Sequence, residues 1–494
     1  MKNIPTVTLG IVAVSRDCFP ISLSHRRREQ VVTAFRKAGG VIFEAQTIVE
    51  NENDALKALE EIRQAGVNAL VVYLGNFGPE GPETLLCQEF GGPTMFVAAA
   101  EENIEVLTSD RGDAYCGMLN CSYNVGLRGL KPYIPEYPVG TPAEVSAMIA
   151  EFLPIARALL GVRKLKIFSF GPRPYDFLAC NAPIAPLFRL GVNIQENSEM
   201  DLLDAYKKHD GDARIDALAR EMAQELGQHG NRYPAVLPRL AQYELTLLDW
   251  AEQQKGAAEY VCFANKCWPA FESFFGFVPC YVNSRLAQRG CPVSCEVDIY
   301  GALSEFIGAC VTERSVTLLD INNTVPEEMY RKEISGKHPY GPSEVFMGFH
   351  CGNTPLDNLE SGVMGYQLIM KRSLEPDGEP DITRGTLEGT IKRGPITFYR
   401  LQGNAESRLV AYVAQGEVLP VEPRSFGGIG VFAIPQMNRF YRHVLIEKRY
   451  PHHGAVAFGL AGKALFETFK ILGVEDISFN QPAGMLYRTE NPFA

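Results

Sequence analysis

The chain has 494 residues, of which 46% are hydrophobic and 21% charged, and its formal net charge is -11. This length predicts about three domains with a sizeable core, and the composition is that of an ordinary globular protein. The acidic balance lacks the basic patch that nucleic-acid binding requires, so we expect no nucleic-acid partner.

The N-terminal sequence and the cysteines bear on the cellular compartment. The first residues carry one lysine and a short apolar run that Pro5 and Gly10 interrupt, which is typical of a first strand rather than of a signal peptide. No uncharged run approaches ~18 residues, so we expect no membrane span. The 12 cysteines include no CxxC pair. This pattern indicates reduced thiols, mostly buried, in a cytoplasmic protein.

The first third of the chain alternates strands and helices. Such alternation predicts a mostly parallel, doubly wound sheet, whose strands end at a ligand-binding edge. Arg16 lies on this edge, and the run Arg26–Arg28 begins the next helix. Three successive arginines cannot share one helical face. The run is therefore either a solvated first turn or an anion clamp suited to carboxylate, phosphate or sulfonate. The predicted strands are 6–14, 41–45, 69–74 and 94–98, and the helices are 26–37 and 50–65.

A proline-rich passage at residues 132–142 marks the first domain boundary, and a second α/β run follows. Here we predict helices at 143–160, 212–226 and 243–255, and strands at 165–170 and 260–264. The loop after residue 170 contains neither GxGxxG nor a P-loop, so no nucleotide is indicated. Trp268 follows the strand 260–264 and precedes a proline. It is either a platform that stacks on a sugar or an interface or core residue.

Residues 291–323 carry two carboxylates 24 positions apart. Glu296 precedes a predicted helix whose apolar residues recur at helical spacing from 299 to 310. A short buried strand is predicted at 315–319. Asp320 directly follows it, and Asn322 lies two positions further on. A helix start and a strand end both expose an acid without disturbing apolar packing, so the two acids could converge. The alternative is an acid beside a helix dipole and an unrelated turn acid.

Beyond residue 323, short alternating apolar runs broken by Gly and Pro predict an antiparallel barrel or sandwich. His350 ends one of these strands, and the pair His452-His453 precedes a predicted helix at 459–472. We predict that this pair lies in a loop; it is not the helical H-E-x-x-H signature, so a zinc protease is not indicated. Two carboxylates with one imidazole favour Mn²⁺, Mg²⁺ or Co²⁺ over a thiolate-type zinc site. Without the rest of the chain, the better interpretation of the two histidines is that they are surface or core residues.

The predicted fold class is α/β, with two doubly wound parallel-sheet domains followed by a β-rich, barrel-like C-terminal domain. The predicted boundaries are 1–140 for the first domain, 141–322 for the second and 323–494 for the third. The second domain carries the two carboxylates, and the third carries the histidines.

Five blocks of the chain together resemble the L-fucose/L-arabinose isomerase superfamily. The resemblance runs through the whole chain in order and implies a Mn²⁺-dependent aldose–ketose isomerase. It also implies a homo-oligomer, usually a hexamer, in which the N-terminal domain of one subunit helps close a neighbour's active site. The blocks are 266–269, 295–303, 318–323, 349–353 and 451–453.

The resemblance also implies roles for single residues. Glu296 and Asp320 match the metal-binding acids of fucose isomerases, and His453 matches the histidine ligand. His350 matches a fourth ligand of arabinose isomerases, but that position need not bind metal in fucose isomerase-like proteins. Asp320 is the fucose-type choice, so we expect three protein ligands with His350 near the substrate. The other predicted substrate-binding residues are Trp268, Asn353, Asn322, Arg16 and Arg26.

The expected chemistry explains these residue types. Moving a carbonyl between C1 and C2 of a sugar requires the removal of a proton from carbon, which passes through an enediolate. A divalent metal supplies a Lewis acid. One carboxylate takes the C2 proton while its partner moves a proton between O1 and O2. We predict that Glu296 and Asp320 are this acid–base pair.

The sequence leaves the substrate open. The chain is shorter than typical fucose isomerases, and its N-terminal edge carries Arg16 and the arginine run. An arginine there either selects an anionic C6 substituent, as in sulfoquinovose (the product being sulfofructose), or binds a hydroxyl of a neutral 6-deoxy or pentose-type sugar. Two non-enzymatic interpretations also stand. A sugar-binding protein needs an export signal and has no use for a Glu/Asp/His set, and a regulatory homologue would carry a broken ligand set.

Overall fold

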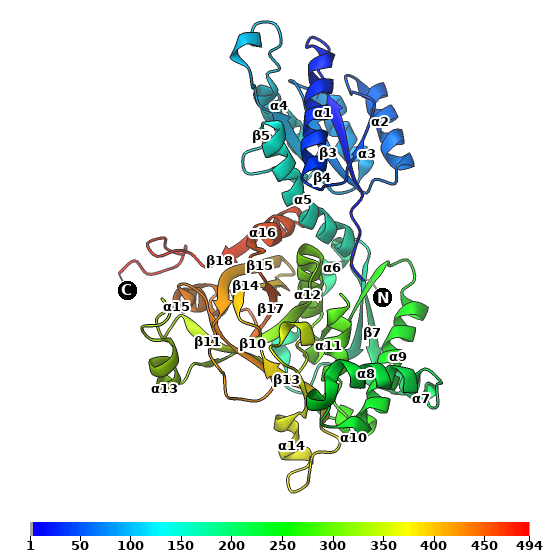
Figure 1. The fold of residues 1–494 in the computed structure, drawn as a ribbon, viewed down its shortest axis with the longest axis vertical. Coiled ribbons are helices and arrows are strands. Elements are labelled where there is room, and N and C mark those ends of the chain that lie inside the picture. The colour runs from blue at the N-terminus through cyan, green and yellow to red at the C-terminus, as the bar shows by residue number, and fades with distance from the viewer. Residues whose placement is uncertain (1–2, 494) are drawn as a thin grey trace. The chain divides into compact units, whose positions relative to one another are not determined.

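The computed structural model describes residues 3–493, which divide into two compact units (Figure 1). One unit spans residues 5–160. The other comprises residues 3 and 4 together with 161–493. The three-domain division stays a prediction.

The first unit is built on a five-stranded sheet in the order β2-β1-β3-β4-β5, with every pairing parallel. Strands β1, β3 and β4 are buried along their whole length, because helices precede or follow each of them in the doubly wound pattern. The strands are β1 (Leu9–Val14), β2 (Phe43–Glu44), β3 (Ala69–Leu74), β4 (Thr94–Ala99) and β5 (Val139–Gly140). The helices are α1 (Ile21–Lys37), α2 (Glu52–Gln64), α3 (Glu80–Phe90), the short η1 (Ile104–Val106), α4 (Ala114–Leu127) and α5 (Pro142–Val162).

The second unit begins with a four-stranded parallel sheet in the order β7-β6-β8-β9. The strands are β6 (Leu165–Gly171), β7 (Asn193–Ser198), β8 (Tyr260–Ala264) and β9 (Val293–Ser294). The longer helices are α7 (Glu199–Lys208), α8 (Ile215–Gly230), α9 (Leu237–Gln254), α11 (Cys280–Gln288) and α12 (Ile299–Thr312). The short ones are η2 (Leu178–Cys180), α6 (Ala185–Arg189), η3 (Pro234–Val236), α10 (Phe271–Phe275) and η4 (Cys295–Val297).

The remainder of the second unit is a mixed sheet of nine strands. Its central strands close on themselves in the order β16-β11-β10-β17-β14-β15, because β15 also pairs with β16, and every pairing in this ring is antiparallel. The strands are β10 (Val316–Thr324), β11 (Val345–His350), β12 (Val363–Tyr366), β13 (Arg384–Thr390), β14 (Gly394–Gly403), β15 (Leu409–Val418), β16 (Gly428–Ala433), β17 (His453–Phe458) and β18 (Asp476–Phe479). The helices between them are α13 (Glu327–Met329), η5 (Tyr330–Ile334), η6 (Leu356–Asn358), α14 (Leu368–Leu374), α15 (Met437–Phe440), η7 (Tyr441–Ile446) and α16 (Gly462–Ile471).

This architecture confirms the predicted fold class, with two parallel sheets and a β-rich, barrel-like C-terminal part. Helix α12 connects the parallel sheet to the ring, because it packs against β8 and also against β14 and β17. Residues 299–311 of this helix are all buried. A helix that is apolar all round fits only such a fully enclosed position.

The cysteines and the apolar helices complete the description of the fold. All 12 cysteines are free thiols, and most of them are buried. One described helix, α5, is long and apolar enough to cross a membrane, but 56% of its apolar stretch is buried inside the protein. A buried core helix of a soluble protein meets the same length and composition test, so α5 is weak support for a membrane span.

Candidate metal and active site

Three side chains from different elements face one another in the second unit. The Nε2 atom of His453 lies 3.2 Å from Oε2 of Glu296 and 3.4 Å from Oδ1 of Asp320. Asp320 and His453 are register partners across β10 and β17, so the ring itself sets that pair side by side. Glu296 reaches them from η4, which follows β9 at the carboxyl edge of the parallel sheet.

The backbone at Glu296 is held in a costly conformation. Glu296 has φ 53° and ψ 27°, and the next residue, Val297, has φ 56°. A non-glycine residue in this left-handed region costs roughly 1–3 kcal/mol, and a β-branched valine is especially disfavoured there. The N–H of Val297 donates to the carbonyl of Asn265 at 2.8 Å, which ties the strained turn to the end of β8. Such strain is typical of functional sites, where the surrounding fold fixes the direction of one side chain.

Asp320 lies in the middle of a strand, and the prediction that the strand ends at Leu319 is wrong. Strand β10 continues to Thr324, with a register shift between Ile321 and Asn323. The polar run after Leu319 is typical of a turn. It forms a strand because β10 is paired on both sides near Asp320, with β11 and with β17. His453 also differs from prediction, since it opens β17 rather than lying in a loop.

Two groups of side chains here could hold a metal ion, because the potential ligand atoms within each lie within 4.8 Å of one another: Asp320, His452 and His453 form one group, and Cys295, Glu296 and His350 the other. Oε2 of Glu296 and Oδ1 of Asp320 are buried and have no hydrogen-bond partner among the described residues. A buried acceptor without a partner costs about 1–3 kcal/mol, and a cation between the two carboxylates and the imidazole would satisfy both oxygens. Burial opposes ionisation of Glu296, but the His350 and His453 imidazoles outweigh it and hold its pKa well below the usual range. The donor set of two carboxylates and one imidazole suits a hard cation.

Behind His453 lies a buried charge pair that sequence reasoning missed. Oδ2 of Asp298 lies 2.9 Å from Nδ1 of His453. Arg400 donates to both oxygens of Asp298, at 2.8 and 2.9 Å, in a bidentate pair that is almost fully buried. Burial opposes ionisation of Asp298, but Arg400 and then His453 outweigh it and hold the pKa of this carboxyl well below its usual range. The available signal was an arginine at the centre of the apolar strand β14.

The other predicted residues of the second unit are placed around this centre. His350 ends β11, with Nε2 3.6 Å from Oε2 of Glu296. Asn353 is buried, and its Oδ1 has no hydrogen-bond partner among the described residues. The ring of Trp268 meets that of Phe177 edge to face, with centroids 6.4 Å apart. Asn322 lies on β10 with an exposed side chain.

Phe177 is an aromatic residue at this site that no sequence pattern indicated. Its ring centroid lies 5.3 Å from that of His452 and 6.1 Å from that of His453. The sulfur of Cys180, in the same loop after β6, lies 3.4 Å from Nδ1 of His453. This loop therefore forms an aromatic wall, together with Trp268, beside His453.

The predicted arginines of the first unit have partners within that unit. The guanidinium of Arg16 lies 4.7 Å from the centre of the Phe77 ring and 3.6 Å from the carboxylate of Glu80. Arg26 is half-exposed and pairs with Asp110. The two arginines after it are buried and pair with Glu101 and Glu44. Arg26 is therefore the one arginine of the run whose side chain is substantially exposed.

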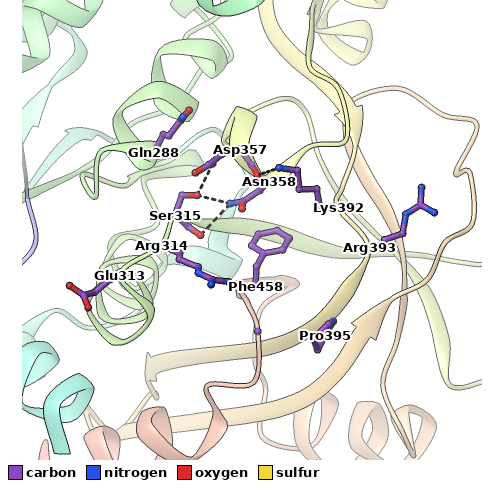
Figure 2. A pocket seen from close by; sticks show the side chains of 11 residues that line it. Gln288, Glu313, Arg314, Ser315, Asp357, Asn358, Lys392, Arg393, Pro395 and Phe458 are labelled. Carbon is purple, nitrogen blue, oxygen red and sulfur yellow. Dashed lines mark hydrogen bonds between the residues drawn. The ribbon is translucent and has the colours of Figure 1, made fainter. Parts of the chain in front are cut away.

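A separate hollow of about 570 Å³ lies near the start of β10 (Figure 2). Four of its lining residues are joined by hydrogen bonds. Ser315 donates to the Asp357 carboxylate at 2.7 Å, Asn358 donates to Ser315, and Lys392 donates to the Asp357 carbonyl at 2.6 Å.

Comparison with known proteins identifies the class to which this fold and site belong. Residues 10–163 match the family described as "Fucose/sulfoquinovose isomerase, N-terminal domain". Residues 348–478 match "L-fucose isomerase, C-terminal domain". The chain therefore belongs to the fucose isomerase-like superfamily, within the L-fucose/L-arabinose isomerases. Membership in this family supports the assignment of the protein as an aldose–ketose isomerase.

Curated relatives lie in the same superfamily. The chain is 22% identical over 481 residues to "Sulfoquinovose isomerase" of Priestia aryabhattai, an alignment that covers 95% of this chain and 98% of the relative. The same values hold for "Sulfoquinovose isomerase" of Priestia megaterium. A protein of the same name from Alkalicoccus urumqiensis is 25% identical over 248 residues, covering 49% of each chain.

Proposed function

We propose that this protein is a metal-dependent isomerase that interconverts an aldose and its ketose, with Glu296 and Asp320 as both metal ligands and acid–base pair. The observation that carries the proposal is the convergence of two partnerless carboxylate oxygens on Nε2 of His453, at 3.2 and 3.4 Å. Membership in the fucose isomerase-like superfamily supports the reaction class.

The residues of the chain account for the steps of proton transfer. A divalent cation, when bound, supplies Lewis-acid stabilisation of the negative charge that develops during the reaction. Either Glu296 or Asp320 accepts the C2 proton on its carboxylate oxygen, and the other carries a proton between O1 and O2. His453 is fixed by Asp298, so its ring cannot rotate away from the two carboxylates. The buried setting limits the access of water, which would compete for these protons.

The proposed metal is Mn²⁺, with Mg²⁺ or Co²⁺ as substitutes, because the proposed ligands are carboxylate oxygens and one imidazole nitrogen. We further propose a cytoplasmic homo-oligomer, with a hexamer in which subunits share active sites as the expected form. Each of these assignments rests on the family. Metal analysis of the purified protein and light scattering test them directly.

The proposed substrate is a hexose with an anionic C6 substituent, such as sulfoquinovose, which would be converted to sulfofructose. The names of the curated relatives support this choice over a neutral 6-deoxy or pentose sugar. Arg16 and Arg26 are the proposed contacts for the anionic group, since the fork of a guanidinium suits a sulfonate. Trp268, Asn353, Asn322 and His350 are the proposed contacts for the rest of the sugar.

One assay tests both the reaction and the substrate. Mn²⁺-loaded protein is incubated with sulfoquinovose, L-fucose, L-arabinose or D-arabinose, and ketose formation is followed. We expect turnover with sulfoquinovose, and its loss in Glu296→Gln and in Asp320→Asn, because each variant removes one acid–base group. Glu406→Gln, at an exposed loop position, is the control. Near wild-type turnover in either active-site variant would overturn the assignment, and sugar binding without turnover in the wild type would favour a non-catalytic sugar-binding homologue.

A further inference from the structure

The hollow near the start of β10 is lined by two cations that have no counter-ion among the residues the structure describes. The ammonium of Lys392 donates to the backbone carbonyl of Asp357, an uncharged partner, at 2.6 Å. The guanidinium of Arg314 is exposed and, within the same described residues, forms neither a hydrogen bond nor an ion pair. Arg393 also lines the hollow, but it pairs with the carboxylate of Glu360 at 3.0 Å. Arg314 and Lys392 are therefore available to bind an anion.

Phe458 adds an apolar face to this lining. Its ring is partly buried and packs on one side against the core of the second unit. In the view of Figure 2 the ring stands between the side chains of Arg314 and Lys392, whereas the carboxylate of Glu313 is directed away from the other lining residues. The second acid, Asp357, accepts a hydrogen bond from a hydroxyl group of the lining at 2.7 Å. A molecule with an apolar face and an anionic group matches this arrangement.

We propose that the hollow is an effector site for a small organic anion that carries a phosphate or sulfonate group on a ring. The planar fork of the Arg314 guanidinium suits two oxygens of such a group, and the Lys392 ammonium supplies a point charge. The volume of about 570 Å³ lies within the range of roughly 300–1,000 Å³ that is usual for small-molecule sites. The inference goes beyond the proposed function, because isomerisation of a sugar at the candidate active site requires no second anion site.

The hollow lies at the far end of the two strands that carry Asp320 and His453. Strands β10 and β17 pair in unbroken register over five residue pairs, the last of which is Asp320 with His453. At the other end of this pairing, Ser315 directly precedes β10 and Phe458 ends β17, and both line the hollow. Four residues of extended strand separate the two ends, which is roughly 13 Å. The hollow is thus distinct from the candidate active site but is built on the same two strands.

A loop gives a second connection between the two sites. It follows His350 at the end of β11 and contains Asp357, whose carboxylate and carbonyl accept from Ser315 and Lys392. An ammonium has three donors, so Lys392 can bind the anion and keep its bond to Asp357. A bound anion would then tie this loop to Arg314, just before β10. Occupancy of the hollow thereby restrains segments that carry residues of the candidate active site, and such coupling is reciprocal.

Binding is tested with full-length protein by titration calorimetry at low ionic strength. The probes are glucose 6-phosphate and morpholinoethanesulfonate, with glucose as the neutral control, and tighter binding of one probe identifies a phosphate or a sulfonate as the preferred group. We expect Arg314→Gln and Lys392→Gln each to weaken binding of the preferred probe by about 10–100-fold, as for the loss of one charged hydrogen-bond donor. Arg372→Gln removes an exposed arginine elsewhere in the same unit and should change binding by less than about threefold. Absence of binding in the wild type, or equal binding in all three variants, would overturn the proposal.

The effector role is tested by hydrogen exchange, which needs no turnover. A saturating concentration of the preferred probe should slow exchange of the backbone amides at 351–358 and in β10, and Arg314→Gln at the same concentration should show no such slowing. The probe should also change the Mn²⁺ dissociation constant by at least about threefold. Binding at the hollow with unchanged exchange and unchanged Mn²⁺ affinity would overturn the effector role. If the protein isomerises no sugar but shows these responses, the proposed function fails while the effector site stands.

Discussion

Replacing Arg400 with methionine should destabilise the second unit strongly, because it leaves a carboxylate buried without its counter-charge. Arg400 is fully buried and makes two charge-assisted hydrogen bonds to Asp298 as well as one to Gln402 at 2.8 Å. After Arg400→Met, Asp298 keeps only the Gly301 N–H and the His453 imidazole as partners. Removing one partner of a buried ion pair costs about 3–5 kcal/mol, and that is the loss we expect in the free energy of unfolding.

Tryptophan fluorescence is the appropriate assay, because Trp250 and Trp268 are the only tryptophans and both lie in the second unit. Urea unfolding is followed in EDTA, so that metal binding does not add to the stability. Arg393→Met is the control, since Arg393 is exposed and pairs with Glu360 at the surface, and it should shift stability by less than about 1 kcal/mol. A loss below about 1 kcal/mol for Arg400→Met would refute the assigned role of the buried pair.

The remaining predictions concern a pH-dependent carboxyl group, a helix contact and the metal. Burial raises the pKa of Glu83 from 4.5 to about 8, so the contribution of this group to stability is fully present below pH 4.5 and is lost progressively as pH rises from there through 8. At about 1.4 kcal/mol per pH unit the loss amounts to roughly 4–5 kcal/mol above pH 9. In calorimetric unfolding, Glu83→Gln should lack this pH-dependent loss of stability. A pH profile of stability that is the same in Glu83→Gln and in the wild type would contradict the prediction. Gly308→Ala should cost about 1–3 kcal/mol in the same fluorescence assay, because a Cβ there lies 1.7 Å from the buried Tyr399 hydroxyl. If Gly308→Ala left the stability unchanged, α12 would have shifted to accommodate the added methyl group, and the predicted clash would be wrong. Mn²⁺ at 100 times its dissociation constant should stabilise the protein by about 2.7 kcal/mol over EDTA, provided it binds only the folded state, and no shift in melting temperature would argue against a metal site.

The sequence predicts elements best where local pattern and tertiary environment agree. Strands β3 and β8 have the predicted bounds, because each is a continuous apolar run that a parallel sheet buries on both faces. Strand β10 runs five residues past its predicted end, because its polar second half is stabilised by pairing with β11, which lies far away in sequence. Closure of the ring through β15 and β16 depends on a pairing of the same long-range kind. No local signal encodes it.

The candidate site shows the same division between local and long-range information. Residue type and resemblance point to Glu296, Asp320 and His453, because each stands in a recognisable block. Asp298 and Arg400 lie 102 positions apart, and nothing in either neighbourhood specifies that they meet. The contact of this buried pair with His453 therefore becomes visible only in three dimensions.

Asp298 explains why the strained turn at Glu296 can be maintained. The same carboxylate accepts from the N–H of Gly301 at the start of α12, from Arg400 on β14 and from His453 on β17. It thereby fixes the helix start, two residues after Glu296, to the two strands that carry Arg400 and His453. The left-handed residues at 296 and 297 are thus held between β8, through Asn265, and the ring, through Asp298. The cost of that turn is offset by burial and pairing of its neighbours, which leaves one carboxylate oxygen of Glu296 directed at His453 and free to bind a cation.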